Sequence, residues 1–284
     1  MDSSKFLILG VNGQLGRALS VLYPQAQKTD IDELDITSFQ SVNNYNWDNI
    51  TTILNAAAYT NVDGAETEEG QASAWAVNDK AVASLADIAK VKNLLLVHIS
   101  TEYVFDGTKG PHKEDEPPSP LGVYAKTKTA GDKAAAKAPK HYIVRTSWVI
   151  GDGKNFARTM LELGKQGVAP TVVADQIGRP TFTTELAKAI KFLIDKKAPY
   201  GTYNVTNEGE PVSWADFTRA IFKEAGLDLN VTDTTTEKYF AAKPGVAPRP
   251  LNSVLDLSKI ESAGFSPRDW REDLKDYIRK ELKK

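Results

Sequence analysis

Tyr124 and Lys128 are separated by four positions in a segment whose residue pattern predicts a helix. At this spacing, two side chains lie one above the other on the same face of a helix. An ammonium group next to a tyrosine favours the phenolate, so it lowers the pKa of a side chain that ordinarily titrates at about 10. The pair could therefore deliver a proton at neutral pH, with Tyr124 as the donor and Lys128 setting its acidity.

Ser100 and Thr101 end the apolar run at residues 94–99, which precedes the Tyr124 helix. Open α/β folds bind ligands at the carboxyl edge of the sheet, where these hydroxyls would lie. The hydroxyl of Thr101 could hydrogen-bond an oxygen on which negative charge develops during hydride transfer. A tyrosine and a lysine at this spacing also occur by chance on surface helices, so the catalytic interpretation depends on Thr101 and on a cofactor site nearby.

Gly10, Gly13 and Gly16 give the spacing G-x-x-G-x-x-G, after an apolar run at residues 6–9 and before a helical pattern. Glycines at these places allow a tight turn, let the backbone approach a pyrophosphate and direct the helix N-terminus toward its charge. Asp30 lies 20 residues beyond the first glycine, where a carboxylate can accept hydrogen bonds from ribose hydroxyls. A glycine turn without a ligand is the alternative, but the strand, the helix and Asp30 together favour a dinucleotide site.

The dinucleotide is expected to be NADH or NADPH, with NADH slightly favoured. Asp30 would repel the 2′-phosphate of NADPH, although Arg17 or Lys28 could compensate for it. The small residues 56–58 let a flat cofactor lie close to the sheet, and Lys128 can reach a ribose. The predicted cofactor-binding residues are Gly10, Asn12, Gly13, Gln14, Leu15, Gly16, Asp30, Asp35, Ile36, Ala56, Ala57, Ala58, Tyr59, Tyr124 and Lys128.

Strand-like apolar runs alternate with helical patterns, which implies parallel strands joined by helical crossovers. The chain is therefore predicted to be an α/β protein with a Rossmann-type doubly wound parallel sheet and a smaller C-terminal substrate-binding lobe. We place the dinucleotide-binding domain at residues 1–150 and the mainly substrate-binding lobe at 151–284, from which some segments return to the first domain. Strands are predicted at 6–9, 50–54, 94–99 and 142–146, and helices at 66–91, 124–138, 184–194 and 213–225.

Composition excludes several classes of protein. The 284 residues include no cysteine and three scattered histidines, so disulfides, thiolate sites and a metal cluster are not expected, and nothing supports a bound Mg²⁺. A formal net charge of −2 gives no field for holding nucleic acid. The apolar runs are far shorter than the roughly 20 residues that a membrane span needs. We expect a cytoplasmic protein without a membrane or nucleic-acid partner.

Tyr124 and Lys128 belong to a longer series of motifs that is far more specific than the glycine turn alone. The other members are residues 10–16, 55–63, 100–107, 145–148, 175–181 and 249–253. On these motifs the sequence resembles the extended short-chain dehydrogenases, and within them the dTDP-4-dehydrorhamnose reductases, nearly from end to end. The resemblance implies that NAD(P)H reduces the C4 ketone of dTDP-4-dehydro-L-rhamnose to dTDP-L-rhamnose, a precursor of cell-surface polysaccharide.

The same resemblance implies the roles of individual residues. Thr101, Tyr124 and Lys128 match the catalytic set of the family. The substrate would be a dTDP-sugar, and the question of a homodimer stays open. The residues that the resemblance places at the substrate are Thr101, Glu102, Trp148, Arg249 and Asn252. Trp148 could instead be core, Arg249 a surface charge and Asn252 a turn residue.

Glu102 is a departure from the family, which usually has an aspartate there, so any contact between this carboxylate and the sugar is open to change. Two other functions are alternatives for a sequence of this kind. A sugar-nucleotide dehydratase or epimerase of the same fold has adjacent carboxylates after the threonine, whereas Thr101 is followed by Glu102 and Tyr103. A non-catalytic, cofactor-binding regulatory subunit would not need the intact set of Thr101, Tyr124 and Lys128.

Overall fold

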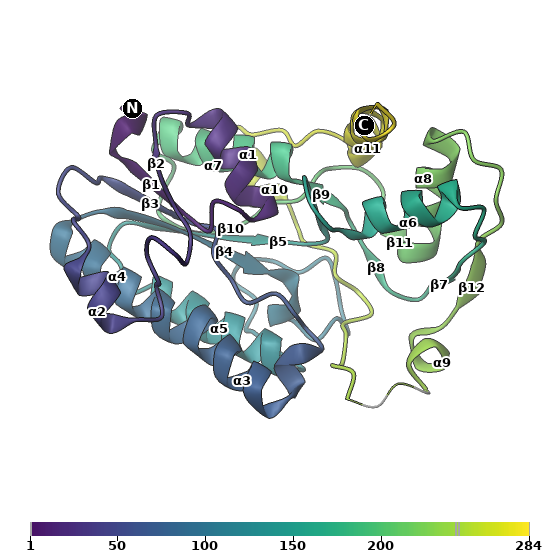
Figure 1. The fold of residues 1–284 in the computed structure, drawn as a ribbon, viewed down its shortest axis with the longest axis horizontal. Coiled ribbons are helices and arrows are strands. Elements are labelled where there is room, and N and C mark those ends of the chain that lie inside the picture. Colours follow the sequence, from purple (N-terminus) through teal and green to yellow (C-terminus); the bar gives the residue numbers. More distant parts are fainter. Residues whose placement is uncertain (1, 242, 244, 284) are drawn as a thin grey trace.

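Six parallel strands form the central sheet of the computed structural model, which describes residues 2–241, 243 and 245–283. Their order is β10-β5-β4-β3-β1-β2, so the direction of winding changes between β1 and β3 (Figure 1). This doubly wound α/β sheet confirms the predicted fold class. The strands are β1 (Phe6–Leu9), β2 (Gln27–Thr29), β3 (Thr52–Asn55), β4 (Leu95–Thr101), β5 (His141–Thr146) and β10 (Gly201–Asn204).

Helices cover both faces of this sheet (Figure 1). All four residues of β1 are buried, as expected for a parallel strand between two helical layers. One apolar core lies under α1, α7 and α10, and the other under α2, α4 and α5. These helices, with α3 and the π-helix η3, are α1 (Gln14–Leu22), α2 (Phe39–Asn44), α3 (Glu68–Trp75), η3 (Ala76–Lys80), α4 (Ala81–Lys92), α5 (Val123–Ala135), α7 (Thr183–Lys196) and α10 (Ser258–Ser262).

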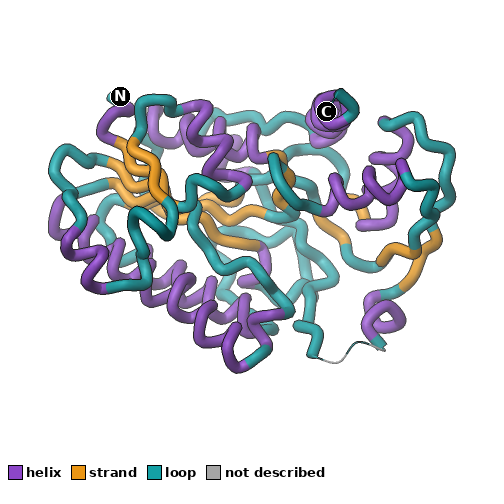
Figure 2. The backbone as a smooth tube through the Cα atoms, in the orientation of Figure 1, coloured by secondary structure: helices purple, strands orange, loops and turns teal. Residues whose placement is uncertain are grey.

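A smaller lobe lies beside the sheet and has its own apolar core, built around Phe217 and Trp270 (Figures 1 and 2). It contains three short two-stranded sheets, in which β6 pairs with β9, β8 with β11 and β7 with β12. Its elements are β6 (Val149–Ile150), α6 (Phe156–Lys165), β7 (Thr171–Val173), β8 (Ile177–Gly178), β9 (Thr181–Phe182), β11 (Val212–Ser213), α8 (Trp214–Glu224), β12 (Thr232–Thr234), α9 (Thr236–Phe240) and α11 (Trp270–Glu281).

The second half of the chain also contributes to the first domain. Strand β10 completes one edge of the central sheet beside β5, and α7 packs against α1. The division at residue 150 stays a prediction, and the segments that return are α7, β10 and α10. Three 3-10 helices complete the described elements: η1 (Ser3–Lys5), η2 (Gly64–Glu66) and η4 (Glu102–Val104).

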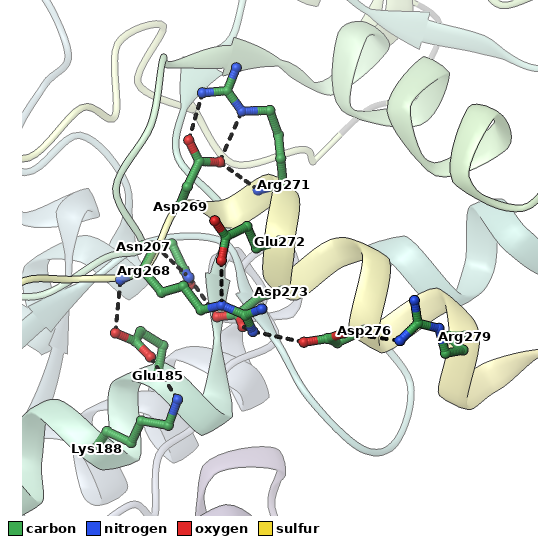
Figure 3. A network of polar contacts seen from close by, with 10 residues as sticks. All are labelled: Glu185, Lys188, Asn207, Arg268, Asp269, Arg271, Glu272, Asp273, Asp276 and Arg279. Atoms are coloured by element: carbon green, nitrogen blue, oxygen red, sulfur yellow. Dashed lines mark hydrogen bonds and ion pairs between the residues drawn. The ribbon is translucent and has the colours of Figure 1, made fainter.

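Arg268 fixes the start of α11 against the rest of the molecule. Figure 3 shows its guanidinium among carboxylates of α11 that include Asp273 and Asp276. The backbone N–H of Arg268 donates to Glu185 on α7, and Asp273 accepts a hydrogen bond from Asn207, shortly after β10. The network therefore ties the last helix to both the Rossmann core and the smaller lobe.

The sequence predicted most elements of the central sheet and missed two long helices of the smaller lobe, α6 and α11. The expected strands and helices correspond to β1, β3, β4, β5, α5, α7 and α8, and the expected helical stretch at residues 66–91 is α3, η3 and α4. Strands of two or three residues, such as β2 and β8, are too short to give a periodic pattern. In the described ranges, no helix combines the length and the hydropathy that crossing a membrane requires.

The interior of α7 offers a test of this architecture. Leu193 is fully buried between α7 and the sheet, so Leu193→Ala should lower the free energy of unfolding by about 2–5 kcal/mol. Val91 on α4 is 78% exposed, so Val91→Ala should change the free energy of unfolding by no more than about 0.5 kcal/mol. Urea denaturation measures both. Equal losses for the two variants would contradict the assignment of α7 to the core.

Candidate active site

A cavity of about 550 Å³ opens at the carboxyl ends of β3, β4 and β5. It brings together Thr101 from the end of β4, Tyr124 and Lys128 from α5, and Trp148 from the segment after β5. Glu102 lines it as well. Parallel strands present their carboxyl ends at one edge, and the pairing of Thr101 with Thr146 aligns β4 and β5 there. Segments far apart in the sequence thus meet at one site.

Thr101 joins β4 to the short helix η4. Its hydroxyl accepts a hydrogen bond from the backbone N–H of Tyr103 (3.2 Å) and donates to Oε2 of Glu102 (2.7 Å). Burial raises the pKa of Glu102 to about 7, although the hydrogen bond from Thr101 acts in the opposite direction. Near neutral pH, this carboxyl is therefore divided between its neutral and charged forms.

Tyr124 lies in the first turn of α5, where its ring meets that of Tyr103 edge to face at 5.7 Å. The backbone N–H of Val123 donates to Glu66 Oε1 (2.8 Å), which fixes the start of the helix. Burial raises the pKa of Tyr124, the charge of Glu102 raises it further, and a hydrogen bond with Thr101 lowers it. The four-residue spacing predicted that Lys128 lowers the pKa of Tyr124, whereas burial outweighs the other influences and raises it.

Lys128 is 2% exposed, and its ammonium donates a 2.6 Å hydrogen bond to the carbonyl oxygen of Ile99. Burial lowers the pKa of Lys128 to about 8, while the charge of Asp132 raises it. The bond to β4 holds the side chain along the floor of the cavity. The protonation state of Lys128 near neutral pH therefore depends on its buried neighbours.

A second cavity, of about 360 Å³, lies between the glycine turn and the loop after β2. Gly13, Ala56 and Ala58 line both cavities, so the two adjoin across the point where the sheet changes direction. Of the predicted cofactor-binding residues, those that line this second cavity are Gly10, Asn12, Gly13, Asp30, Asp35, Ile36, Ala56, Ala57 and Ala58. Those that line the larger one include Gln14 and Leu15.

The glycines of the turn are needed for space and for backbone conformation. Gly10 has φ +71°, and a Cβ there would lie 2.8 Å from the backbone of Ala57. A Cβ on Gly16 would lie 2.1 Å from the carbonyl oxygen of Gly10, so Gly16 lets α1 approach the turn rather than lining either cavity. Tyr59 lines neither cavity: its N–H donates to Asn78, and its hydroxyl packs beside Gly70.

Asp30 is fixed in place by the backbone. Its Oδ2 accepts from the N–H of Asn12 (2.9 Å), and its Oδ1 accepts from the N–H of Ile31 (2.9 Å). Among the described residues that line the smaller cavity, the ionisable side chains are Asp30 and Asp35, both acidic. This end of the site therefore presents negative charge and hydrogen-bond acceptors.

Trp148 forms the opposite wall of the larger cavity. Its backbone has φ +45°, which is rare for a bulky residue, and its ring stacks on Trp214 with centroids 3.5 Å apart. Gly178 makes room for the indole, because a Cβ there would lie 2.8 Å from Trp148. Trp214 and Lys154 also line the cavity, and neither was predicted because neither belongs to a recognisable motif.

The structure does not bring Arg249 and Asn252 into this cavity. Arg249 forms an ion pair with Asp63 (2.8 Å) and lies over the ring of Phe240. Asn252 accepts from the N–H of Val254, and its side chain packs against Gly110. In the part of the chain that the structure describes, no three histidine, aspartate or glutamate side chains are grouped as they would be to hold a metal ion.

The chain is similar over nearly its whole length to a known protein family and to a characterised relative. The family model described as the RmlD substrate binding domain matches residues 4–283. A dTDP-4-dehydrorhamnose reductase from Aggregatibacter actinomycetemcomitans is 41% identical, over 96% of this chain and 97% of its own length.

Two solved structures of dTDP-4-dehydrorhamnose reductases are similar over nearly the whole chain. The Clostridium acetobutylicum protein has a TM-score of 0.89 and 40% identity, and the alignment covers 96% of this chain and 98% of that one. The Bacillus anthracis protein, solved in complex with NADP, has a TM-score of 0.89 and 34% identity, covering 97% and 98%.

The buried carboxyl of Glu102 makes stability depend on pH. Its folded pKa of about 7 lies above the ordinary value of 4.5, so its contribution is fully present below about pH 4.5 and is lost as the pH rises through about 7. Glu102→Gln stays neutral, so its free energy of unfolding should rise relative to the parent by about 3 kcal/mol between pH 4.5 and pH 8. Urea denaturation across this range measures the difference.

The exposed Glu237 on α9 provides the matched control, and Glu237→Gln should show no such trend. A difference between Glu102→Gln and the parent that stays constant from pH 4.5 to pH 8 would show that Glu102 titrates normally.

Proposed function

We infer that this chain, which belongs to the RmlD substrate-binding family of dTDP-4-dehydrorhamnose reductases, uses NAD(P)H to reduce the C4 ketone of dTDP-4-dehydro-L-rhamnose to dTDP-L-rhamnose. The observation that carries this conclusion is the convergence of Thr101, Tyr124 and Lys128 on one cavity, next to the glycine turn. Membership of this family confirms the function expected from the sequence.

The two adjoining cavities fit a dinucleotide. The glycine turn keeps side chains away from the cavity wall at Gly10 and Gly13, and the N-terminus of α1 offers backbone N–H groups to a pyrophosphate. Asp30 has lone pairs for ribose hydroxyls, and Lys128 lies at the opposite end of the path. When bound, NAD(P)H supplies the hydride for the ketone carbon.

Tyr124 is the proposed donor of the proton to the ketone oxygen as that oxygen becomes an alkoxide. Its raised pKa keeps the hydroxyl protonated until the substrate oxygen needs the proton. The ammonium of Lys128 then stabilises the tyrosinate that remains, because the two residues share one face of α5. A half-buried tyrosine thus acts as an acid when a strongly basic oxygen forms beside it.

Thr101 is proposed to share the substrate oxygen with Tyr124. Its single hydroxyl hydrogen points to Glu102 in this structure, so it is free for the substrate only when Glu102 is protonated and becomes the donor. The pKa of Glu102, near 7, allows that exchange at neutral pH. Glu102 can in this way act through Thr101 without touching the substrate.

Reduction without loss of water agrees with the single carboxylate after Thr101. Dehydration needs an acid and a base besides the tyrosine, and Tyr103 stands in the place of the second carboxylate. An assay of NADH oxidation with a dTDP-4-keto-sugar distinguishes a reductase from a regulatory subunit. Such a subunit would bind NADH yet would not oxidise it.

The smaller lobe is proposed to hold the nucleotide part of the substrate. Trp148 and Trp214 form an aromatic wall suited to stacking, and the cations Arg17 and Lys154 line the same cavity. Arg249 stays a proposed diphosphate contact that would have to exchange its ion pair with Asp63. Asn252, three residues after Arg249, also stays a proposed substrate contact.

NADH is proposed to serve at least as well as NADPH. The smaller cavity is lined by two carboxylates, which would repel a 2′-phosphate, and Lys28 donates to the carbonyl of Pro24 instead of lining this cavity. The Bacillus anthracis relative holds NADP, so preference is a matter of degree within the family.

The chain is further proposed to act in the cytoplasm, where nucleotide sugars and NAD(P)H are available, and to form a homodimer. Val21 on α1 is 79% exposed and lies at the rim of a separate groove next to α7 and α11, which offers apolar surface to a second copy. Light scattering during gel filtration should give twice the chain mass of 31.1 kDa for a dimer.

Replacing Tyr124 with phenylalanine removes the proposed proton and little else. Positioned general acids contribute about 10²–10⁴-fold, so kcat with the dTDP-4-keto-sugar should fall by that factor while NADH affinity stays nearly constant. Tyr45 lies at the end of α2, away from the cavity, and Tyr45→Phe should keep parental kcat. A parental rate in Tyr124→Phe would mean that the proton comes from another group.

Asp30→Ala tests the ribose contact and the cofactor preference together. A hydrogen bond to a charged group contributes about 1.5–3 kcal/mol, so NADH should bind about 10- to 150-fold more weakly in a fluorescence titration. NADPH should lose less, because its 2′-phosphate no longer meets a carboxylate. Asp32→Ala, at an exposed neighbouring position, is the control. Equal losses for both dinucleotides would limit Asp30 to supporting the turn.

A further inference from the structure

A buried cluster of charged and polar side chains lies behind Lys128, outside the residues that line the cavity. Asp132 is one helical turn beyond Lys128 on α5, just as Lys128 is one turn beyond Tyr124. Arg145 on β5 and His98 on β4 complete the cluster, and all three are 5% exposed or less. Burying so many ionisable groups costs free energy unless they serve one another.

Asp132 is held mainly by Arg145. Its Oδ2 accepts a 3.1 Å hydrogen bond from Nε of Arg145, while Nη1 of Arg145 donates to the carbonyl oxygen of Glu114. The guanidinium also lies 5.2 Å from the centre of the Phe105 ring. The arginine is thus anchored on three sides, and it fixes the carboxylate in one orientation.

The second oxygen of Asp132 is left for its other neighbours. Oδ1 is buried and lies 3.9 Å from Nε2 of His98. Burial, and then the charge of Lys128, lower the pKa of His98 well below its usual value, so the imidazole is neutral. The cations that face Asp132 are therefore Arg145 and Lys128.

We propose that Asp132 is a positioning residue that keeps Lys128 in its ammonium form and so poises Tyr124 for proton transfer. The clause about Tyr124 rests on the proposed function, whereas the effect on Lys128 does not. Burial alone would drive Lys128 toward the neutral amine, and Asp132 is the carboxylate that acts against it. Burial also raises the pKa of Asp132, and the charge of Arg145, a hydrogen bond with Ser100 and the charge of Lys128 oppose that rise.

The balance of charge shows why this arrangement favours the reaction. With Tyr124 and Glu102 both protonated, the buried groups carry two positive charges, on Lys128 and Arg145, and one negative charge, on Asp132. When Tyr124 gives its proton to the substrate oxygen, the tyrosinate adds a second negative charge, and the net buried charge falls to zero. The charge of Asp132 itself raises the pKa of Tyr124, so Asp132 favours the tyrosinate only through the charge that it maintains on Lys128.

The direct test is the titration of Lys128 in the intact protein. Lysine labelled with ¹³C at Cε reports protonation by NMR, and Lys128→Met identifies the resonance of Lys128. In Asp132→Asn, the pKa of Lys128 should fall by about 1–3 units relative to the parent. In Asp132→Glu, which keeps the negative charge, it should move by less than about half of that shift. An unchanged titration in Asp132→Asn would overturn the proposal.

Asp132→Asn leaves Arg145 buried without its partner, which can prevent folding. The double variant Asp132→Asn with Arg145→Gln removes both charges and avoids this problem. Because it also removes the repulsion between Arg145 and Lys128, a smaller downward shift of the pKa of Lys128 is expected in it. A pKa of Lys128 above the parental value in the folded double variant would equally overturn the proposal. Asp87→Asn, at an exposed position on α4, is the matched control and should leave Lys128 unchanged.

Turnover separates this inference from the proposed function. If both are right, the alkaline limb of the pH profile of kcat for the dTDP-4-keto-sugar moves to lower pH in Asp132→Asn by the same amount as the Lys128 titration. If the titration shifts and the rate profile does not, the role of Asp132 toward Lys128 stands and the catalytic role of Lys128 falls.

Discussion

The close contact of backbones at the glycine turn is the constraint on which the rest of the site depends. Gly16 lies against the carbonyl of Gly10, and Gly10 lies against the backbone of Ala57, with no space for a Cβ at either place. Strands β1 and β3 can thereby leave a crevice between their carboxyl ends that is walled by backbone and small side chains. Without this approach, the two cavities would have no common wall for a dinucleotide to follow.

The reacting end of the site is built on the opposite principle, since it buries charge rather than exposing backbone. Glu102, Lys128 and Asp132 are all withdrawn from water, and burial pushes the pKa of each toward its neutral form. Hydrogen bonds oppose this effect on Glu102, and the attraction between Lys128 and Asp132 opposes it on those two residues, so the protonation states depend on nearby groups. Such a cluster responds strongly to one added or removed charge, which suits it to proton transfer.

The fold and the grouping of Thr101, Tyr124 and Lys128 at one cavity could be predicted because each depends on local patterns. Short apolar runs predicted β1 and β4, and a four-residue spacing on a helix placed Tyr124 beside Lys128. The direction of the Tyr124 pKa could not be read from that spacing, since it depends on burial by distant segments. The stacking of Trp214 on Trp148 and the ion pair of Arg249 with Asp63 could not be predicted for the same reason. These partners lie 66 and 186 residues apart, so no local pattern in the sequence connects them.

Strand β10 and helix α7 have a consequence for how the molecule is made. Until residue 204 has left the ribosome, β5 has an open edge and α1 lacks the helix that packs against it. A nascent or proteolysed chain that ends near residue 150 would present both an unpaired strand and an apolar helix face, which are features that promote aggregation. Residues 1–150 therefore lack one edge strand and one covering helix of their own sheet. During synthesis, the solubility of this half depends on α7 and β10, which are made later.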